Sequence, residues 1–335
     1  MTAPPETIVK ALRRLQLLPA DGAVEGAPLA GGVSSDIWRI ETAAGPICAK
    51  RALAKLKVAA DWRAPVERNI YEARWLGRAG LADARLAPRM LGQDAASGVL
   101  ALEWLDPADH PVWKAELLAG RVDPGFAARV GDGLGRIHAA TAIARDPTVA
   151  AEFPTDAIFY AIRLEPYLAA TARAWPSLAS QLEDLIQRTA ATRLALVHGD
   201  VSPKNILIGA HGPVFIDAEC AVAGDPAFDL AFCLNHLLLK RAPLPEQAPA
   251  LAASFRALAA AYLARVDWEE PTDLEARAAG LLPALFLARV DGKSPAEYVT
   301  SDADKNRIRQ TAIPLIRTPP NRLEAVLAAW DAAFA

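Results

Sequence analysis

The sequence predicts an α+β protein in which a β-rich amino-terminal lobe precedes a larger, mostly helical lobe. Up to about residue 105, short apolar runs separated by turns are typical of strands. After residue 105, alanine- and leucine-rich stretches with helical spacing dominate. The sequence has no internal repeat, and no long polar linker separates the two parts. We therefore expect two lobes, residues 1–105 and 106–335, that pack directly against each other with a cleft between them.

Composition restricts the class of protein. The 335 residues have a net charge of −3 and are 53% hydrophobic, which argues against disorder and against a basic nucleic-acid binder. Cys48, Cys220 and Cys233 lack the spacing of a disulfide framework or zinc site, so we expect buried thiols. The sequence has neither a signal-peptide pattern nor an apolar run of about 20 residues. We expect a soluble, cytoplasmic monomer or homodimer without a nucleic-acid or membrane partner.

The amino-terminal lobe is expected to hold an antiparallel sheet and one helix within it. Residues 1–16 form an amphipathic helix that prolines open, ahead of the sheet. Residues 65–76 form the helix of the lobe, since Pro65 suits a first helical turn. The strand-like runs are residues 27–32, 36–43, 46–53, 87–92 and 98–105.

The carboxyl-terminal lobe begins with a well-marked helix. Asp123 and Pro124 suit its cap and first turn, and apolar residues follow at helical spacing. Further helical stretches cover about 155–190, 225–240, 247–265, 272–289 and 321–334, and one β-like island interrupts them at 194–217.

That island carries the chemistry-bearing residues. An apolar run ends in His198-Gly-Asp200, Asn205 follows five residues after Asp200, and another apolar run ends at Asp217. Strand ends would therefore bring two carboxylates and a carboxamide together. Oxygen ligands of this kind suit a hard cation such as Mg²⁺. If Asn205 and Asp217 hold the cation, Asp200 is free to accept a proton, which is the division of roles in phosphoryl transfer.

The motifs HGDVSPKN (198–205) and IDAE (216–219) resemble those of the aminoglycoside phosphotransferase and choline kinase superfamily, relatives of the protein kinases. The resemblance implies a bilobal protein-kinase-like fold and dependence on Mg²⁺ and on ATP or GTP. It makes Asp200 the catalytic base and Asn205 and Asp217 the metal ligands. Glu219 would support a second metal ion.

The amino-terminal lobe has the matching nucleotide-binding pattern. The turn within residues 28–39 is similar to the superfamily's phosphate loop, which assigns phosphate contacts to Gly31, Gly32, Ser34 and Ser35. The next strand carries Lys50, which would anchor the α- and β-phosphates.

The resemblance extends to the partners of these groups. Glu72 fits the position of the glutamate that pairs with Lys50, and Glu67 remains a competitor. Residues 102–105 resemble the hinge that binds adenine through its backbone, which points to Glu103 and Leu105. Ser202 stands where kinases contact the γ-phosphate, whereas we expect Lys204 to be exposed. Asp229 would brace the catalytic loop and Asp225 would cap a helix.

The acceptor is not determined by these motifs. Arg163, Arg289 and Lys293 either line the acceptor site or lie at solvated helix ends, and an inward orientation would favour an anionic acceptor. A polycationic aminoglycoside would instead need carboxylates, such as the acidic run at 267–270.

We therefore hypothesise a phosphotransferase that moves the γ-phosphoryl group of ATP or GTP to a hydroxyl of a small metabolite. A methylthioribose-kinase-like sugar kinase is the alternative within the same class. A non-catalytic nucleotide-binding pseudokinase is an alternative of another class, but the sequence retains Lys50, Asp200, Asn205 and Asp217. A metallohydrolase with His198 and Asp200 as ligands would leave Lys50 and Asn205 unexplained.

Overall fold

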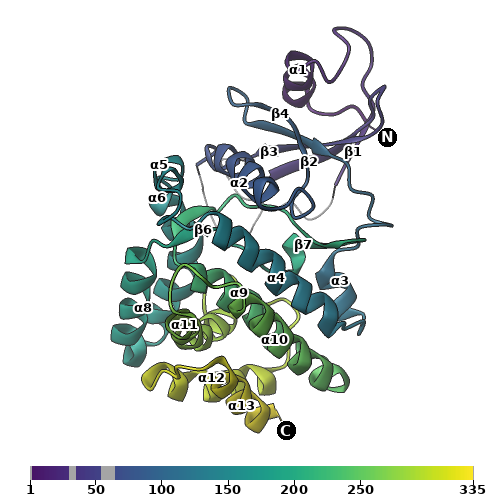
Figure 1. Cartoon of the computed structure of the whole chain (residues 1–335). Coiled ribbons are helices and arrows are strands. Elements are labelled where there is room, and N and C mark those ends of the chain that lie inside the picture. Colours follow the sequence, from purple (N-terminus) through teal and green to yellow (C-terminus); the bar gives the residue numbers. More distant parts are fainter. Residues whose placement is uncertain (1, 30–34, 54–64, 335) are drawn as a thin grey trace.

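A five-stranded antiparallel sheet forms the amino-terminal lobe of the protein, whose computed structural model describes residues 2–29, 35–53 and 65–334 (Figure 1). The strand order is β1-β2-β3-β5-β4, so each hairpin partner is a neighbour and β5 lies between β3 and β4. The predicted antiparallel sheet is confirmed. Its strands are β1 (Gly26–Pro28), β2 (Ser35–Ile40), β3 (Ile47–Ala52), β4 (Met90–Asp94) and β5 (Val99–Glu103).

The alternation of side chains along β3 and β5 explains how this sheet is covered. Ala49, Val99 and Ala101 point to one face, where they pack with helix α1 (Glu6–Arg14) through Ile8 and Leu12. The alternate residues Leu100 and Leu102 point to the other face and join the main core with helix α2 (Arg68–Ala82). Lys50 is paired in register with Leu100 and so also lies on the α2 face. The sheet thus delivers this lysine toward the helical lobe.

The carboxyl-terminal lobe is helical and contains the larger core (Figure 1). Helix α4 begins at the predicted cap, where the Asp123 carboxylate accepts a hydrogen bond from the Gly125 N–H at 2.8 Å. Its Gly131 lets α10 approach closely, since a Cβ there would lie 2.2 Å from the Leu258 carbonyl oxygen. Long helices of the lobe include α4 (Pro124–Ala140), α9 (Pro226–Lys240), α10 (Ala248–Leu263) and α11 (Pro271–Asp291).

The other elements of the lobe differ in part from the prediction. The expected helical stretch at 155–190 is divided into several elements, which include a ten-residue π-helix, η1 (Tyr160–Ala169), with Pro166 inside it. Helix α12 (Asp302–Arg317) was not predicted, because its first half is mostly polar and Pro314 lies within it. The remaining helices are α3 (Trp113–Leu118), α5 (Thr148–Glu152), α6 (Asp156–Phe159), α7 (Ala170–Ala174), η2 (Pro176–Leu178), α8 (Ala179–Ala191), η4 (Pro245–Gln247) and α13 (Leu323–Phe334).

The predicted β island forms two small antiparallel pairs. Strand β6 (Ala195–Val197) pairs with β9 (Val222–Gly224), and β7 (Ile206–Gly209) pairs with β8 (Gly212–Phe215). The short 3₁₀ turn η3 (Pro203–Asn205) leads directly into β7. The motif segments 198–205 and 216–219 therefore each connect one strand pair with the other: 198–205 runs from β6 to β7, and 216–219 runs from β8 toward β9.

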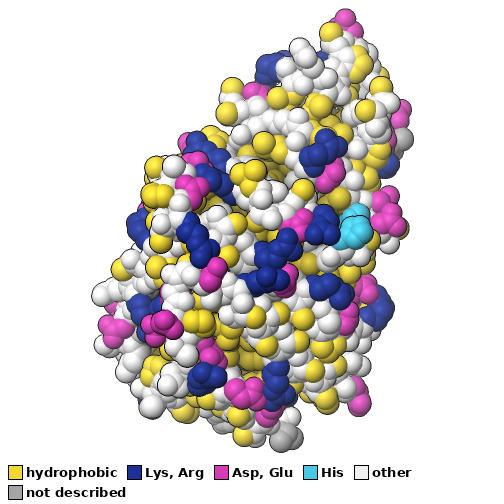
Figure 2. All heavy atoms as spheres, in the orientation of Figure 1, with side chains coloured by type: hydrophobic (Ala, Val, Ile, Leu, Met, Phe, Trp, Pro, Cys, Tyr) yellow, Lys and Arg dark blue, Asp and Glu magenta, His cyan; other side chains and the backbone are white. Residues whose placement is uncertain are grey.

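The surface is mixed in charge. On the face drawn in Figure 2, acidic and basic side chains lie next to one another with apolar side chains between them. Among the helices of the described residues, none has both the length and the apolar character that a membrane span requires.

Candidate active site

The loop after β6 is fixed by a buried carboxylate. Asp229, in the first turn of α9, accepts hydrogen bonds from the backbone N–H groups of His198 at 2.7 Å and Gly199 at 2.8 Å. This is the bracing role that the sequence assigned to Asp229. Gly199 has a φ of 78°, and a Cβ at this position would lie 2.6 Å from the Cys220 carbonyl oxygen. The loop therefore needs glycine at this point.

The His198 ring serves this loop. Its Nδ1 accepts from the Asp200 N–H at 3.1 Å, and its Nε2 lies 3.1 Å from the Ile216 carbonyl oxygen. These partners fit a neutral ring with the proton on Nε2. Burial lowers the pKa of His198, which favours the neutral form. His198 thus ties the Asp200 loop to the segment that carries Asp217.

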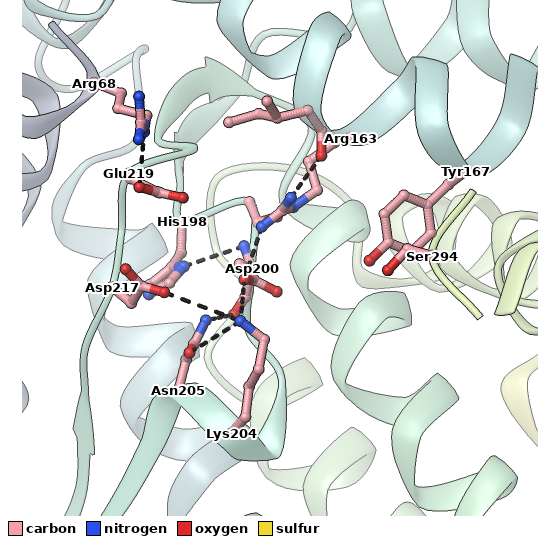
Figure 3. Close-up of polar contacts among 12 residues, drawn as sticks. Arg68, Arg163, Tyr167, His198, Asp200, Lys204, Asn205, Asp217, Glu219 and Ser294 are labelled. Carbon is pink, nitrogen blue, oxygen red and sulfur yellow. Dashed lines mark hydrogen bonds and ion pairs between the residues drawn. The ribbon is translucent and has the colours of Figure 1, made fainter. Parts of the chain in front are cut away.

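Asp200 lies at the centre of the site with two cations beside it (Figure 3). Its Oδ2 is 2.7 Å from Arg163 Nη2 and 2.8 Å from Lys204 Nζ, and its side chain is almost fully buried. Burial alone would raise the pKa of Asp200, but Arg163 and Lys204 more than offset it, so this pKa is lowered. A buried carboxylate is thereby kept ionised at neutral pH.

Asp217 and Lys50 connect the two lobes. Asp217 has a φ of 67°, a left-handed conformation that a non-glycine residue adopts at a cost and that is common at functional sites. Its Oδ1 accepts from the Lys50 ammonium, whose second partner is Glu72 Oε2 at 2.8 Å. Burial opposes charge on both groups, but their attraction dominates: it raises the pKa of Lys50 and lowers that of Asp217. Glu72 therefore pairs with Lys50, whereas Glu67 is exposed.

Lys204 is exposed along half of its side chain, as expected, but its ammonium is not isolated in solvent. It lies 2.8 Å from Asp200 Oδ2 and 3.3 Å from Asn205 Oδ1, and 4.0 Å from Asp217 Oδ2. The Asn205 amide also donates from Nδ2 to the Asp200 carbonyl oxygen at 3.1 Å. The side-chain oxygens of the three predicted residues, Asp200, Asn205 and Asp217, thus lie around one ammonium group.

This arrangement fits a Mg²⁺ site that a nucleotide completes. Among the described residues, no group of three or more His, Cys, Asp and Glu side chains could hold a metal ion by itself. Mg²⁺ commonly takes only one or two protein ligands and fills its shell with phosphate oxygens and water. Asp217 and Asn205 could provide such a pair, since the Lys204 ammonium lies 3.3 Å from Asn205 Oδ1 and 4.0 Å from Asp217 Oδ2.

Glu219 points elsewhere in this structure. Its Oε2 accepts from Arg68 Nε at 2.9 Å (Figure 3). Arg68 is fully buried and also donates to the Leu53 carbonyl oxygen at 2.7 Å. Sequence reasoning did not identify Arg68, because an arginine at the start of a helix usually lies on the solvated face. The metal-supporting role of Glu219 stays a prediction.

The nucleotide-contact predictions fall partly outside the described residues. Gly31, Gly32 and Ser34 lie outside the described residues, whereas Ser35 begins β2 and is buried. Ser202 is also buried, and its Oγ has no hydrogen-bond partner among the described residues.

The segment expected to be the hinge follows β5. Glu103 ends this strand, and its side chain accepts from the Arg89 N–H at 2.8 Å, which ties it to β4. Leu105 follows the strand and is partly exposed. The assignment of this segment to adenine stays a prediction.

The three cationic residues considered for the acceptor differ in position. Arg163 contacts Asp200, and Arg289 is buried in the helical lobe. Lys293 is exposed and pairs with Glu165 at 2.7 Å. In the acidic run at 267–270, Asp267 pairs with Arg145 and Glu269 pairs with Arg277, so these carboxylates are already neutralised.

Sequence comparison finds a family model and curated relatives that match much of the chain. The model of the phosphotransferase enzyme family (APH) matches residues 25–274, most of the chain. A methylthioribose kinase of Pectobacterium atrosepticum is 27% identical over 277 residues, which cover 68% of this chain and 66% of that protein. A methylthioribose kinase of Erwinia tasmaniensis is 25% identical and is covered over 59% of its length. The chain thus spans 66% and 59% of the length of these two relatives, less than two thirds of each.

Solved structures agree with the fold over almost the whole chain. A choline/ethanolamine kinase family protein from Mesorhizobium loti has a TM-score of 0.56 at 18% identity and covers 97% of this chain and 99% of its own. An amicoumacin kinase in complex with AMP-PNP, Ca²⁺ and Ami has a TM-score of 0.57 at 13% identity, with 96% of both chains covered. The predicted protein-kinase-like fold is confirmed.

Proposed function

Because the chain belongs to the phosphotransferase enzyme family, we propose that it is a small-molecule kinase that transfers the γ-phosphoryl group of ATP or GTP to a hydroxyl. One observation carries the proposal: an ionised, buried Asp200 lies in the same site as a Lys50–Asp217 ion pair. The first group suits a base for a hydroxyl, and the second suits the binding of phosphates and their metal ion.

Asp200 is the catalytic base. Its carboxylate accepts the hydrogen bond of the acceptor hydroxyl, orients that oxygen toward the γ-phosphorus, and takes the proton as the new P–O bond forms. The bond between the γ-phosphorus and the bridging oxygen breaks, and the nucleoside diphosphate leaves with the electron pair. Arg163 holds the carboxylate in place through its 2.7 Å contact. Since transfer is direct, we expect no phospho-enzyme.

Lys50 binds the α- and β-phosphates in this proposal, and Glu72 sets the position of its ammonium. Asn205 and Asp217 would hold Mg²⁺, which neutralises phosphate charge when it is bound. Lys204, at the mouth of the same oxygen cluster, would move toward the phosphate oxygens once its present partners bind the cation. Ser202, with its unpartnered Oγ, would contact the γ-phosphate.

The alternatives are less well supported. Methylthioribose kinase relatives favour a sugar acceptor, but they match at 27% identity or below. A metallohydrolase would need a free His198 nitrogen, and both ring nitrogens already have backbone partners. A pseudokinase would not need an ionised base at the position of Asp200.

The proposal is tested by a screen for ADP or GDP formation across sugars, amino alcohols, aminoglycosides and hydroxy acids. We expect one class of acceptor to stimulate nucleotide consumption, EDTA to abolish it, and ³¹P NMR to detect a phosphate monoester. Product formation from an ester or amide substrate with Zn²⁺ and without nucleotide would contradict the proposal and favour the hydrolase.

A further inference from the structure

Two buried cations in the helical lobe differ from all the others described. The buried Lys and Arg side chains are Lys50, Arg68, Arg163, Lys240, Arg241 and Arg289. Four of them form ion pairs, with Glu72 and Asp217, Glu219, Asp200, and Asp331 respectively. For Lys240 and Arg289, no carboxylate of the described residues lies at ion-pair distance. Buried charges are normally paired, so these two need an explanation.

Lys240 is fully buried at the end of α9. Its ammonium lies 4.5 Å from the centre of the Tyr298 ring and has no hydrogen-bond partner among the described residues. Burial, together with the nearby Lys114, lowers its pKa to about 7. An amine in this state gains strongly from an anion, because the anion would supply both a hydrogen-bond acceptor and the missing charge.

Only part of the Arg289 guanidinium has hydrogen-bond partners among the described residues. Its Nη1 donates to Ser294 Oγ at 2.8 Å and to the Tyr167 hydroxyl at 3.3 Å, which orders the segment after α11. Its Nε is buried without a partner in the described part of the chain. A guanidinium can bind a carboxylate or phosphate through two parallel N–H groups.

Both cations belong to a cluster of rings that begins beside Asp200. Arg163, which contacts Asp200, lies with its Cζ 5.8 Å from the centre of the Phe232 ring. Phe232 is 5.4 Å from the Tyr167 ring, against which Arg289 packs. In the other direction Phe232 is 5.6 Å from the His236 ring.

The second branch of this ring cluster leads to the lysine. His236 Nδ1 lies 2.9 Å from the hydroxyl of Tyr298, the ring that contacts Lys240. Figure 3 shows Tyr167 and Ser294 side by side, on the side of Asp200 where Arg163 lies. Both cations are therefore linked to the base through two or three rings.

Cationic side chains outnumber acidic ones around His236, so the electrostatic potential there is positive. The pKa of His236 is lowered well below its usual range by burial, and further by Lys240, Arg289, Lys204 and Lys114. Glu297 is the nearby acid, but it is exposed and already forms an ion pair with Lys114. A cationic acceptor such as an amino sugar would be repelled here, whereas an anionic one would be attracted.

We infer that the acceptor carries an anionic group, a carboxylate or a phosphate, that Arg289 and Lys240 bind while its hydroxyl lies at Asp200. This inference rests on the proposed function, because it identifies the class of substrate for the same site. It excludes polycationic acceptors and assigns Arg289 and Lys240 to specificity.

Binding decides the inference without turnover. Melting temperatures and calorimetric titrations are measured for enzyme loaded with Mg²⁺ and AMP-PNP, which occupies the nucleotide site. The probes share one carbon skeleton and differ in one terminal group: glucitol, glucamine, gluconate and glucitol 6-phosphate, with a matching three-carbon set based on glycerol. We expect an anionic member to bind, and the carboxylate and phosphate arms distinguish the two anions.

Three variants locate the site. Arg289→Gln and Lys240→Met are expected to weaken anion binding at least about tenfold, which corresponds to about 1.4 kcal/mol. Lys293→Met, the control, removes an exposed lysine of the same segment and should leave binding unchanged. Lys240→Met should fold at least as well as the wild type, since it removes a buried amine without a partner. Anion binding that is equal in the wild type and both site variants would overturn the inference, as would an absence of anion binding.

Turnover separates this inference from the proposed function. If neutral or cationic members have the highest kcat/KM, the protein is a kinase and the inference is wrong. If anions bind through Arg289 and Lys240 but no nucleotide is consumed with any of them, the anion site stands and the proposed function fails.

Discussion

At the scale of single residues, Lys50 is one of the points where the two lobes meet. Its ammonium is shared between Glu72 of α2 and Asp217 of the helical lobe, and it is almost fully buried. Removal of one partner from a buried ion pair costs far more than loss of an exposed pair, because the remaining charge stays buried. In the proposed function, the position of Lys50 toward the nucleotide would therefore depend on both carboxylates.

Glu72→Gln should lower kcat/KM for the nucleotide by about 10- to 100-fold, since the transition-state position of Lys50 is lost, a change of about 1.4–2.8 kcal/mol. Steady-state kinetics with varied nucleotide measures this change. Glu67→Gln is the matched control, because Glu67 is an exposed glutamate at the start of the same helix. Equal effects of the two substitutions would show that the pair with Lys50 has no functional role.

The sequence predicts single residues well where one short segment carries the information. Asp200, Asn205 and Asp217 come together because the end of β6, the start of β7 and the end of β8 lie close together, and the apolar runs indicate those strand ends. One of the two partners of Asp200, Arg163, was not predictable in the same way. Arg163 lies 37 residues earlier in an irregular π-helix, and only the packing of that helix brings it to the carboxylate.

At the scale of elements, the loop after β6 has little room for a side chain in place of Gly199. Gly199 has a positive φ and faces the backbone of Cys220. By contrast Gly77 lies within α2, and a Cβ at this position would have no other atom within 4 Å. The two glycines thus differ in the space and the backbone conformation available to a side chain.

Gly199→Ala should lower the free energy of unfolding by about 1–3 kcal/mol and reduce kcat sharply, because Asp200 shifts with its loop. Gly77→Ala should instead raise the stability by about 0.5–1 kcal/mol, since alanine favours the helix. Chemical denaturation and kcat measurements on both variants check these expectations. An unchanged kcat in Gly199→Ala would contradict the assigned rigidity of the loop.

The elements themselves were predictable to the extent that they repeat a simple period. The strand runs and helix α4 follow alternating and 3.6-residue patterns, and the structure contains them. The π-helix η1 was expected as part of a regular helix, because single-sequence periodicity does not separate 3.6 from about 4.4 residues per turn over ten residues. Helix α12 was missed because polar and charged residues dominate its first half, and its buried face consists only of Ile308, Thr311, Ala312 and Ile316.

At the scale of the whole molecule, α2 and the residues after it attach the amino-terminal lobe to the helical one. Arg78 pairs with Asp146 at 2.6 Å and with Glu152 at 2.6 Å. Asp83, just after α2, pairs with Arg136 of α4 at 2.6 Å. Arg85 and Arg136 hold the pKa of Asp83 well below its usual range.

This lowered pKa predicts a pH-dependent contribution to stability. A carboxyl whose folded pKa lies below its unfolded value of about 3.9 stabilises the protein above that pH, and the gain disappears as the pH falls toward the folded pKa. Asp83→Asn should therefore lower the free energy of unfolding by about 1–2 kcal/mol at pH 7 and by less at pH 2, closer to the folded pKa. Denaturation at both pH values measures the difference.

Asp184→Asn provides the control for this effect. Asp184 is an exposed acid of α8, and no ion pair joins it to another described residue. Its substitution should change stability by less than about 0.5 kcal/mol at either pH. If Asp83→Asn behaves in the same way, the Asp83–Arg136 contact does not stabilise the lobe interface.

The account depends most directly on Asp200 as the base in phosphoryl transfer. The deciding measurement compares Asp200→Asn with the wild type in two assays: nucleotide consumption with the best acceptor and equilibrium binding of Mg²⁺ and AMP-PNP. The account predicts a loss of kcat by at least about a hundredfold, as for removal of a general base, with the nucleotide Kd changed by less than about threefold. Turnover of the Asp200→Asn variant at the wild-type rate would contradict it.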